Sequence, residues 1–204
     1  MPMNFVYLAS ASPRRRELLK QIGVPYRVID VAVDESVIAG ESAGTYVARL
    51  AAAKVNAAWQ KIRNPPDMRL LNTDMPVLAA DTAVVLGEKI LGKPIDKQDA
   101  TRMLAALSGR THQVLTAVAL QTSSGVMHRV SSSEVTFRSL SALECAIYWD
   151  TAEPRDKAGG YAIQGYAATF IKDLRGSYSG VMGLPLFETA ALLDAAGVPR
   201  WQNT

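Results

Sequence analysis

The sequence predicts an α/β protein built on one mixed sheet that helices cover. Two observations lead to this fold class: apolar runs typical of strands alternate with amphipathic helical segments early in the chain, and a strong hairpin signal follows in the middle. A chain of 204 residues, 49% of them hydrophobic, is long enough to bury a sizeable core and short enough to be one domain. We therefore expect residues 1–204 to fold as a single domain.

The first part of the chain supplies two strand and helix pairs. Its helices are predicted from apolar residues that recur every three or four positions. In order, we expect a buried strand at Phe5–Ala9, a helix from about Pro13 to Ile22, a strand at Tyr26–Val33 and an Ala-rich helix from Ser42 to about Ile62. Segment Asn64–Pro76 contains three prolines and is expected to be a surface loop.

The second part of the chain begins and ends with regular elements. Ser123-Ser124-Gly125 lies between two strand-like runs, which predicts a hairpin, and Ser141 is a good helix N-cap. The expected elements are strands at Val77–Leu86 and Lys89–Leu91, a helix at Gln98–Leu107, hairpin strands at Val114–Thr122 and Val126–Arg138, a helix from Ser141 to about Asp150, a loop at Glu153–Gly165, a strand at Ala168–Leu174 and a helix at Leu184–Ala196.

Composition excludes several classes of protein. The net charge of +3 comes from Lys and Arg residues spread along the chain, so charge alone does not indicate non-specific nucleic-acid binding. One cysteine, Cys145, excludes an internal disulfide framework and a multi-cysteine zinc site, and we expect it to be a buried structural thiol. Met1–Ser10 lacks a basic start, and no apolar run is long enough to cross a bilayer. These features predict a soluble, cytoplasmic protein.

The segment Ser10-Ala11-Ser12-Pro13-Arg14-Arg15-Arg16 is electrostatically unusual. Ser12 and Pro13 suit the start of a helix, but three arginines then occupy the first turn, where the helix dipole favours acidic side chains. The arginines either point into water or bind an anion together with the free N–H groups of the helix. Ser10, at the turn after the strand, favours a phosphate-binding loop.

Asp81 lies in the middle of an apolar strand, where an unpaired carboxylate costs several kcal/mol. It must be hydrogen-bonded, paired with a cation or bound to a metal. Glu35, at the end of the second predicted strand, is a second candidate carboxylate. Two such oxygen donors suit Mg²⁺ or Mn²⁺, which bind few protein carboxylates together with substrate phosphates.

Two lysines are weaker candidates. Lys54 interrupts the apolar face of its helix, where extension to the surface is the commonest outcome, and Lys93 stands beside a turn after the Asp81 strand. Either lysine is a candidate phosphate contact. His112 and His128 show no metal-ligand spacing, and the chain contains neither G-x-G-x-x-G nor a Walker A sequence.

A series of short motifs, in order from about residue 4 to residue 197, resembles the Maf family of nucleotide pyrophosphatases. The motifs are Leu8-Ala9-Ser10-Ala11-Ser12-Pro13-Arg14-Arg15, Asp34-Glu35, Arg49-Leu50-Ala51 with Lys54, Ala80-Asp81-Thr82, Gly92-Lys93-Pro94, Asp156-Lys157-Ala158-Gly159 with Tyr161, Ile163-Gln164-Gly165 and Gly183-Leu184-Pro185. The resemblance implies a mixed, twisted central sheet flanked by helices, two lobes around a deep cleft, a homodimer and a divalent metal such as Mg²⁺, Mn²⁺ or Co²⁺.

The resemblance also implies roles for individual residues. Asp81 would be the proton acceptor, and Glu35 and Asp81 would serve the metal. The triphosphate would be held by Ser10, Arg14, Arg15, Lys54 and Lys93. Arg14, Thr82 and Gln164 match the positions that set base preference in the branch that hydrolyses dTTP and UTP to the monophosphate and pyrophosphate.

Two alternatives to this activity stay open. One is a nucleotide-binding regulator of septum formation that acts through a protein partner without turnover. The other is the specificity of the sister branch, which resembles 7-methyl-GTP pyrophosphatases and carries Trp in place of Arg14. A buried Asp81 together with lysines that are candidate phosphate contacts favours an enzyme over a regulator. Arg14 favours the pyrimidine branch over the sister branch.

Overall fold

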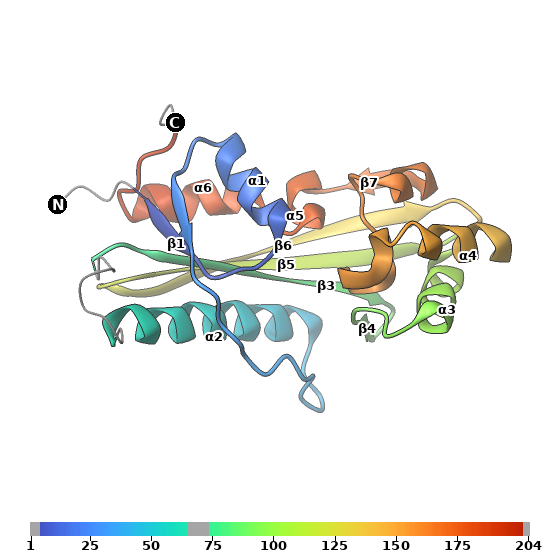
Figure 1. Cartoon of the computed structure of the whole chain (residues 1–204), viewed down its shortest axis with the longest axis horizontal. Coiled ribbons are helices and arrows are strands. Elements are labelled where there is room, and N and C mark those ends of the chain that lie inside the picture. The colour runs from blue at the N-terminus through green and yellow to red at the C-terminus, as the bar shows by residue number, and fades with distance from the viewer. Residues whose placement is uncertain (1–4, 65–73, 202–204) are drawn as a thin grey trace. The chain divides into compact units, whose positions relative to one another are not determined.

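The computed structural model describes residues 5–64 and 74–201 (Figure 1). In these ranges the elements are β1 (Val6–Leu8), α1 (Pro13–Gln21), β2 (Tyr26–Val28), α2 (Ala43–Arg63), β3 (Val77–Leu86), β4 (Lys89–Leu91), α3 (Lys97–Leu107), β5 (Thr111–Thr122), β6 (Gly125–Phe137), α4 (Ala142–Asp150), β7 (Ile171–Arg175), α5 (Tyr178–Met182) and α6 (Leu186–Ala195). Short 3₁₀ helices between α4 and β7 are η1 (Glu153–Asp156), η2 (Ala158–Gly160) and η3 (Tyr166–Phe170).

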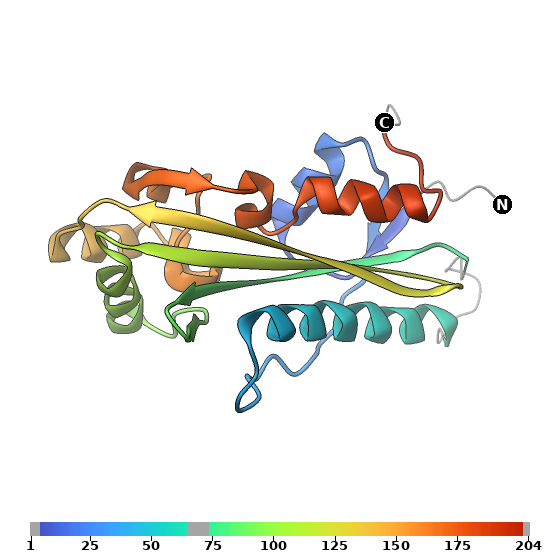
Figure 2. The ribbon, with the colours of Figure 1, turned by 180° about the vertical axis from the view of Figure 1, so that it is seen from behind.

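The strands of the described chain form one seven-stranded sheet. Its order is β2-β1-β3-β5-β6-β7, and β4 pairs with β3. β1 runs parallel to both β2 and β3, whereas the β3–β4 and β6–β7 pairs are antiparallel. A two-residue turn joins β5 and β6, as the hairpin signal predicts, and Figure 2 shows the twist of these long strands. The mixed α/β fold class is therefore confirmed.

The chain divides into two compact units, which we describe separately. The first comprises Met1–Asp81, Thr116–Val130 and Gly183–Thr204, and the second comprises Thr82–Leu115 and Ser131–Met182. The single domain and the cleft between two lobes stay predictions.

The first unit contains α1, α2 and α6 around β1, β2 and the start of β3. Ser42 caps α2 by accepting a hydrogen bond from the Thr45 N–H, as the sequence predicts. α2 and α6 lie on opposite sides of the strands (Figures 1 and 2). The apolar stripe of α2 is buried and comprises Val47, Leu50, Ala51, Val55, Ala58 and Ile62. This burial against the sheet explains why a 21-residue helix forms here.

The second unit has its own core, formed where α3 and α4 pack on each other. Ser141 and Glu144 form a capping box at the start of α4. Edge-to-face contacts join Phe137, Tyr161 and Phe170 in the core, and Cys145 is buried there as a free thiol, as predicted. No helix in the described ranges is both long and apolar enough to span a bilayer.

The predictions for several segments were wrong, and one helix was missed. The strand predicted at Tyr26–Val33 ends at Val28, because β1, its neighbour in the described sheet, ends at the paired residue Leu8. The loop predicted at Glu153–Gly165 contains η1 and η2, and the strand predicted at Ala168–Leu174 starts only at Ile171, after η3. α5 was not predicted. Most of the loop predicted at Asn64–Pro76 lies outside the described residues.

Candidate active site

The candidate site in the first unit lies where the parallel strands β1 and β3 stop pairing. The chain passes from β1 through α1 to β2 on one side, and then through α2 to β3 on the other side. In α/β sheets, ligands bind beyond the carboxyl ends of strands at such a reversal of direction. Ser10 follows β1 directly after Ala9, and Asp81 lies on β3 beyond Leu78, the last residue paired with β1.

Lys54 joins the two predicted carboxylates in this region. Its Nζ lies 2.6 Å from Oδ1 of Asp81 and 2.7 Å from Oε1 of Glu35. The Lys54 and Asp81 side chains are 12% and 10% exposed, whereas that of Glu35 is 44% exposed. Lys54 therefore does not extend into solvent, and the expectation that Asp81 must be paired is confirmed.

Burial determines the protonation behaviour of Asp81. Loss of solvent raises the pKa of its carboxyl above the ordinary value, and the nearby charge of Glu35 acts in the same direction. Lys54 and Arg15 oppose this shift and lower the pKa, but the net direction is upward. A carboxylate whose pKa is raised is a stronger base than an ordinary aspartate, so Asp81 can accept a proton from a water molecule.

Arg15 holds the loop that follows β1. Its NH1 donates to Oγ of Ser10 at 3.1 Å, and its Nε donates to the carbonyl of Gly183 at 2.7 Å. The Ser12 N–H also donates to Oγ of Ser10 at 3.2 Å. Ser10 is almost fully buried, and its hydroxyl therefore organises the turn into α1. The structure thus brings Ser10 and Arg15 together, as the phosphate-loop hypothesis requires.

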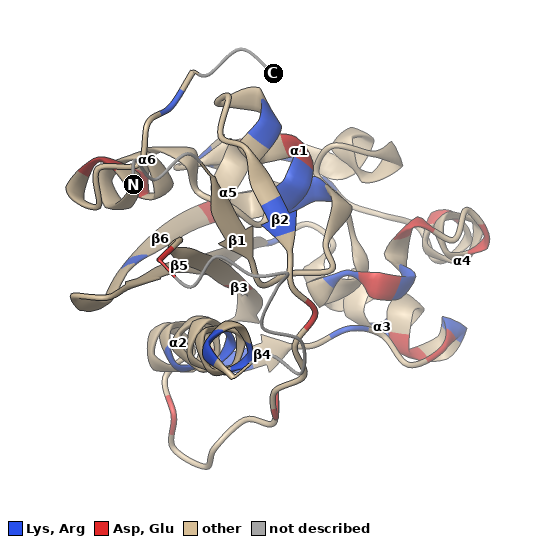
Figure 3. Cartoon of the chain, turned by 60° about the vertical axis from the view of Figure 1, so that its left-hand side comes forward, with Lys and Arg blue, Asp and Glu red and all other residues tan. Residues whose placement is uncertain are grey.

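The start of α1 carries no compensating acidic side chain. Ser12 occupies the N-cap position but makes no side-chain cap, and the first turn contains no Asp or Glu. The consecutive arginines form the blue band on α1 in Figure 3. Positive side chains at the positive end of a helix dipole are unfavourable unless an anion is present. This helix end is therefore suited to bind phosphate.

The loop that carries Glu35 is fastened to α2 by residues that the sequence analysis missed. Tyr46 donates its hydroxyl to the Glu35 carbonyl at 2.9 Å. Arg49 forms an ion pair with Glu41 at 2.7 Å and donates to the Ser36 carbonyl at 3.0 Å. Arg49 belongs to a family-like motif, and as a charged residue next to the buried Leu50 it could have been singled out by the same argument as Lys54.

Three predicted site residues, Thr82, Lys93 and Gln164, belong to the second unit. Thr82 is half-buried, and Lys93 and Gln164 are exposed. The Gly159 N–H donates to the Gly92 carbonyl at 2.9 Å, so two family-like motifs lie side by side in this unit. Gly159 has φ +69°, and a Cβ there would lie 2.8 Å from Val84, which explains why glycine is needed at this contact.

The donor set of the first unit fits a hard divalent cation. Two carboxylates, Glu35 and Asp81, approach the same lysine nitrogen, so both already face one positive charge. Among the described residues no cluster of three or more His, Cys, Asp or Glu side chains could enclose a metal. A pair of carboxylates suits Mg²⁺ or Mn²⁺, which complete their coordination with water and substrate phosphates, and does not suit a structural zinc site.

Known proteins are similar to this chain over most of its length. A family model described as Maf-like protein matches residues 5–196. The chain is 52% identical over 198 residues to a dTTP/UTP pyrophosphatase of Saccharophagus degradans, covering 97% of this chain and 91% of the relative. It is 53% identical over 189 residues to one of Alkalilimnicola ehrlichii, covering 93% and 91% of the two chains. A third such protein, from Cupriavidus metallidurans, is 51% identical over 201 residues, with 96% and 98% covered. The chain belongs to the Maf-like protein family.

Proposed function

We propose that this chain is a hydrolase that converts dTTP and UTP, and modified pyrimidine nucleotides of the same kind, to the monophosphate and pyrophosphate. Such a reaction would remove unwanted nucleotides from the cellular pool. The observation that carries the proposal is the buried Asp81 held by Lys54 beside the end of β1. The names of the relatives, dTTP/UTP pyrophosphatases that are about half identical to this chain, support the choice of substrate.

The proposed reaction is an in-line displacement at the α phosphorus. The oxygen of a water molecule forms a bond to phosphorus, and the bond from phosphorus to the oxygen that bridges the α and β phosphates breaks. Asp81 takes the proton of the attacking water, and pyrophosphate departs with the bonding electrons. The raised pKa of Asp81 supports this role, because the carboxylate is desolvated and gains from accepting a proton.

The basic residues position the triphosphate. Ser10 and Arg15 shape the loop after β1, and Arg14 continues the positive start of α1. Lys54 stands next to Asp81 and would balance negative charge as the phosphates approach. In the second unit, Lys93 is exposed and is proposed as a further phosphate contact. Such positioning and charge neutralisation supply most of the acceleration in phosphoryl-transfer enzymes.

Glu35 and Asp81 would hold the divalent cation, which we propose to be Mg²⁺, Mn²⁺ or Co²⁺. When bound, the cation supplies neutralisation of phosphate charge. Tyr46 and Arg49 keep the loop of Glu35 on α2, so this carboxylate stays close to Asp81 in the first unit.

Base preference is assigned to Arg14, Thr82 and Gln164. The amide of Gln164 has a donor and an acceptor, which can pair with N3–H and a carbonyl of uracil or thymine. Cytosine offers the reverse pattern at N3 and N4. The proposal also includes a homodimer, which rests on the family resemblance, and a cytoplasmic location, which rests on the composition of the sequence.

Product analysis tests the proposal. The chain is incubated with dTTP, UTP, CTP, dCTP, ATP, GTP, 7-methyl-GTP and modified pyrimidine nucleotides, with Mg²⁺, Mn²⁺ or Co²⁺ and with excess chelator. We expect monophosphate and pyrophosphate from dTTP and UTP, and no turnover with chelator. Diphosphate and orthophosphate as primary products would contradict cleavage between the α and β phosphates. Binding without turnover would favour the septum regulator, and preference for 7-methyl-GTP would favour the sister specificity.

A further inference from the structure

Gln164 is an exposed residue at the end of a buried segment of the second unit. The three residues before it, Tyr161, Ala162 and Ile163, are only 4–6% exposed. Gly165 and η3 follow directly. The buried neighbours determine where the backbone of Gln164 lies, because their side chains are packed into the core. What holds this short segment therefore controls where the amide of Gln164 is presented.

Glu153 holds the segment after Gln164. Its Oε2 accepts a hydrogen bond from the Tyr166 N–H at 2.9 Å, and its Oε1 accepts one from the Ala167 N–H at 3.3 Å. These are the first backbone N–H groups of η3, which have no partner inside the helix. The carboxylate of Glu153, which comes from η1, thus caps η3 from outside.

Tyr148 holds the segment before Gln164 and connects it to Glu153. The Tyr148 hydroxyl donates to Oε1 of Glu153 at 2.6 Å and accepts from the Ala162 N–H at 3.2 Å. Burial, followed by the contact with Glu153, raises the pKa of Tyr148, so the hydroxyl keeps the proton that it donates. Two side chains from α4 and η1 therefore contact the backbone on both sides of Gln164.

Gly165 shows how closely Glu153 approaches. A Cβ at position 165 would lie 2.0 Å from Oε2 and 2.3 Å from Cδ of Glu153. The φ of Gly165 is −112°, which any residue can adopt. The glycine is needed here for space, and the space is taken by the Glu153 carboxylate.

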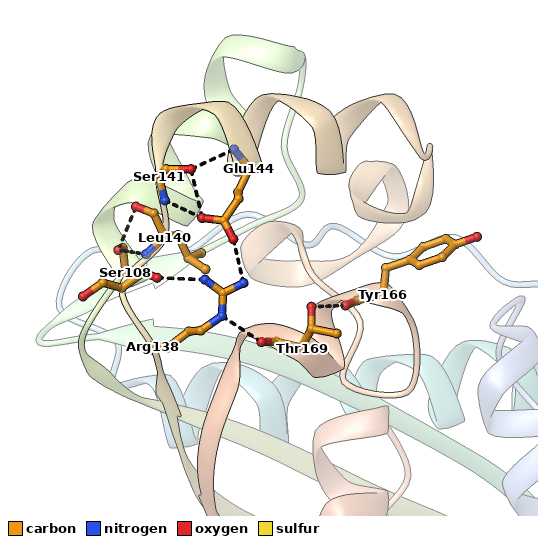
Figure 4. Close-up of polar contacts among 8 residues, drawn as sticks. Ser108, Arg138, Leu140, Ser141, Glu144, Tyr166 and Thr169 are labelled. Carbon is orange, nitrogen blue, oxygen red and sulfur yellow. Dashed lines mark hydrogen bonds and ion pairs between the residues drawn. The ribbon is translucent and has the colours of Figure 1, made fainter.

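Arg138 fixes the far end of η3 (Figure 4). Its Nε donates to the Thr169 carbonyl at 2.9 Å. Its guanidinium also lies 5.4 Å from the centre of the Phe170 ring. The same guanidinium forms an ion pair with Glu144 at 2.7 Å at the start of α4. Because η3 is fixed at both ends, a displacement caused by losing Glu153 should be largest on the side of Gly165 and Gln164.

We propose that Glu153 and Tyr148 are positioning residues for Gln164 and thereby set the preference for uracil and thymine over cytosine. This inference rests on the proposed function, in which Gln164 contacts the base. Neither side chain needs to touch the substrate. Their effect is to hold the amide of Gln164 at one place, so that its donor and acceptor both meet the base.

The test compares Glu153→Gln with a matched control, Glu144→Gln. Each substitution removes one carboxylate that caps a helix of the second unit, but Glu144 contacts Arg138 and Ser141 and not the Gln164 segment. The measurements are kcat/KM for UTP and CTP and the melting temperature. For Glu153→Gln we expect the UTP to CTP ratio to fall about tenfold, chiefly through a higher KM for UTP. Glu144→Gln should keep the ratio. If Glu153 had a merely structural role, the substitution would lower kcat/KM for UTP and for CTP by the same factor.

Two further variants keep the test independent of folding losses. Tyr148→Phe should lower the ratio in the same direction, because the phenyl ring keeps the packing and removes only the hydroxyl. Gly165→Ala should lower it in the wild-type background and have little further effect in a Glu153→Ala background, because the clash is then gone. If the wild type releases pyrophosphate and Glu153→Gln keeps the wild-type ratio of kcat/KM for UTP to that for CTP, the positioning inference alone is overturned. Absence of pyrophosphate release from the wild type would overturn the proposed function.

Discussion

Lys54 on α2 donates a hydrogen bond to Asp81 on β3 over 2.6 Å, and both side chains are nearly excluded from solvent. Such a pair is costly to break, because removing one member leaves the other charged and buried. The second contact of Lys54, with Glu35 at 2.7 Å, ties the pair to a more exposed carboxylate. The three side chains should therefore respond to substitution as a coupled group.

Asp81→Asn is expected to lower kcat by about 10²–10⁴-fold without unfolding the chain, because the amide keeps the size and one acceptor for Lys54 but cannot take a proton. Turnover of dTTP and the melting temperature are measured together. Near-normal turnover would contradict the proton-acceptor role, and a collapse in melting temperature would indicate a structural one.

Lys54→Met is expected to move the acid limb of the kcat/KM profile to higher pH. Lys54 lowers the pKa of Asp81 against the effect of burial, so its removal raises that pKa further, and the active carboxylate forms only at higher pH. The matched control is Lys61→Met on the same helix, since the Lys61 ammonium donates to the Asp30 carbonyl at 3.0 Å and has no role in the proposed site. An unmoved acid limb would show that Asp81 does not control it.

Arg14→Ala is expected to raise KM for the nucleotide and to leave the apoprotein as stable as the wild type or slightly more stable, since it removes a positive charge from the first turn of α1. Arg15→Ala should instead destabilise the fold by about 1–3 kcal/mol, because the Gly183 carbonyl and Ser10 lose their donor. Thermal unfolding without ligand separates the two. Strong destabilisation by Arg14→Ala would favour a structural role for that residue.

Hydrolysis of dTTP and UTP is expected to exceed that of CTP, dCTP, ATP and GTP by about tenfold to a hundredfold or more, from a penalty of roughly 1–3 kcal/mol for each unpaired polar group. Gln164→Glu should damage this preference, because a carboxylate has no donor. The measurement is kcat/KM across the panel. Equal values for UTP and CTP in the wild type, or an unchanged ranking in the variant, would remove Gln164 from base recognition but would leave the proposed pyrophosphate release standing.

His112 is expected to make folding sensitive to acid. It is buried against Tyr161, and burial lowers its pKa to about 4. His112 therefore takes up a proton near pH 6.5 in the unfolded chain but stays neutral in the folded chain. Its contribution to the free energy of unfolding is fully present above pH 6.5 and is lost as pH falls towards 4. Between pH 7 and pH 5 this loss is about 2 kcal/mol. Denaturant unfolding at the two pH values should show that His112→Gln loses less unfolding free energy than the wild type. His128→Gln, which changes an exposed histidine, should behave as the wild type.

The local pattern of the sequence was sufficient for most of the regular elements. The strand at Val77–Leu86 and the long helix after Ser42 were predicted because apolar periodicity and capping residues act over a few neighbouring positions. The same local argument required a partner for Asp81, since a carboxylate in an apolar strand cannot stay unpaired. Motif order further identified the family, which the matched residues 5–196 confirm.

The identity of that partner was decided only by tertiary structure. Sequence favoured an extended, solvated Lys54, but packing of α2 on the sheet directs its ammonium to Asp81 and Glu35, residues 27 and 19 positions away along the chain. The early end of β2 likewise depends on the length of β1, the strand that it pairs with. The cap of η3 depends on Glu153, which lies 13 positions before Tyr166 in the chain. Periodicity reports which face of an element is buried. It carries no information on which charged group from another element meets that face, because the pairing energy exists only once the chain has brought the two together.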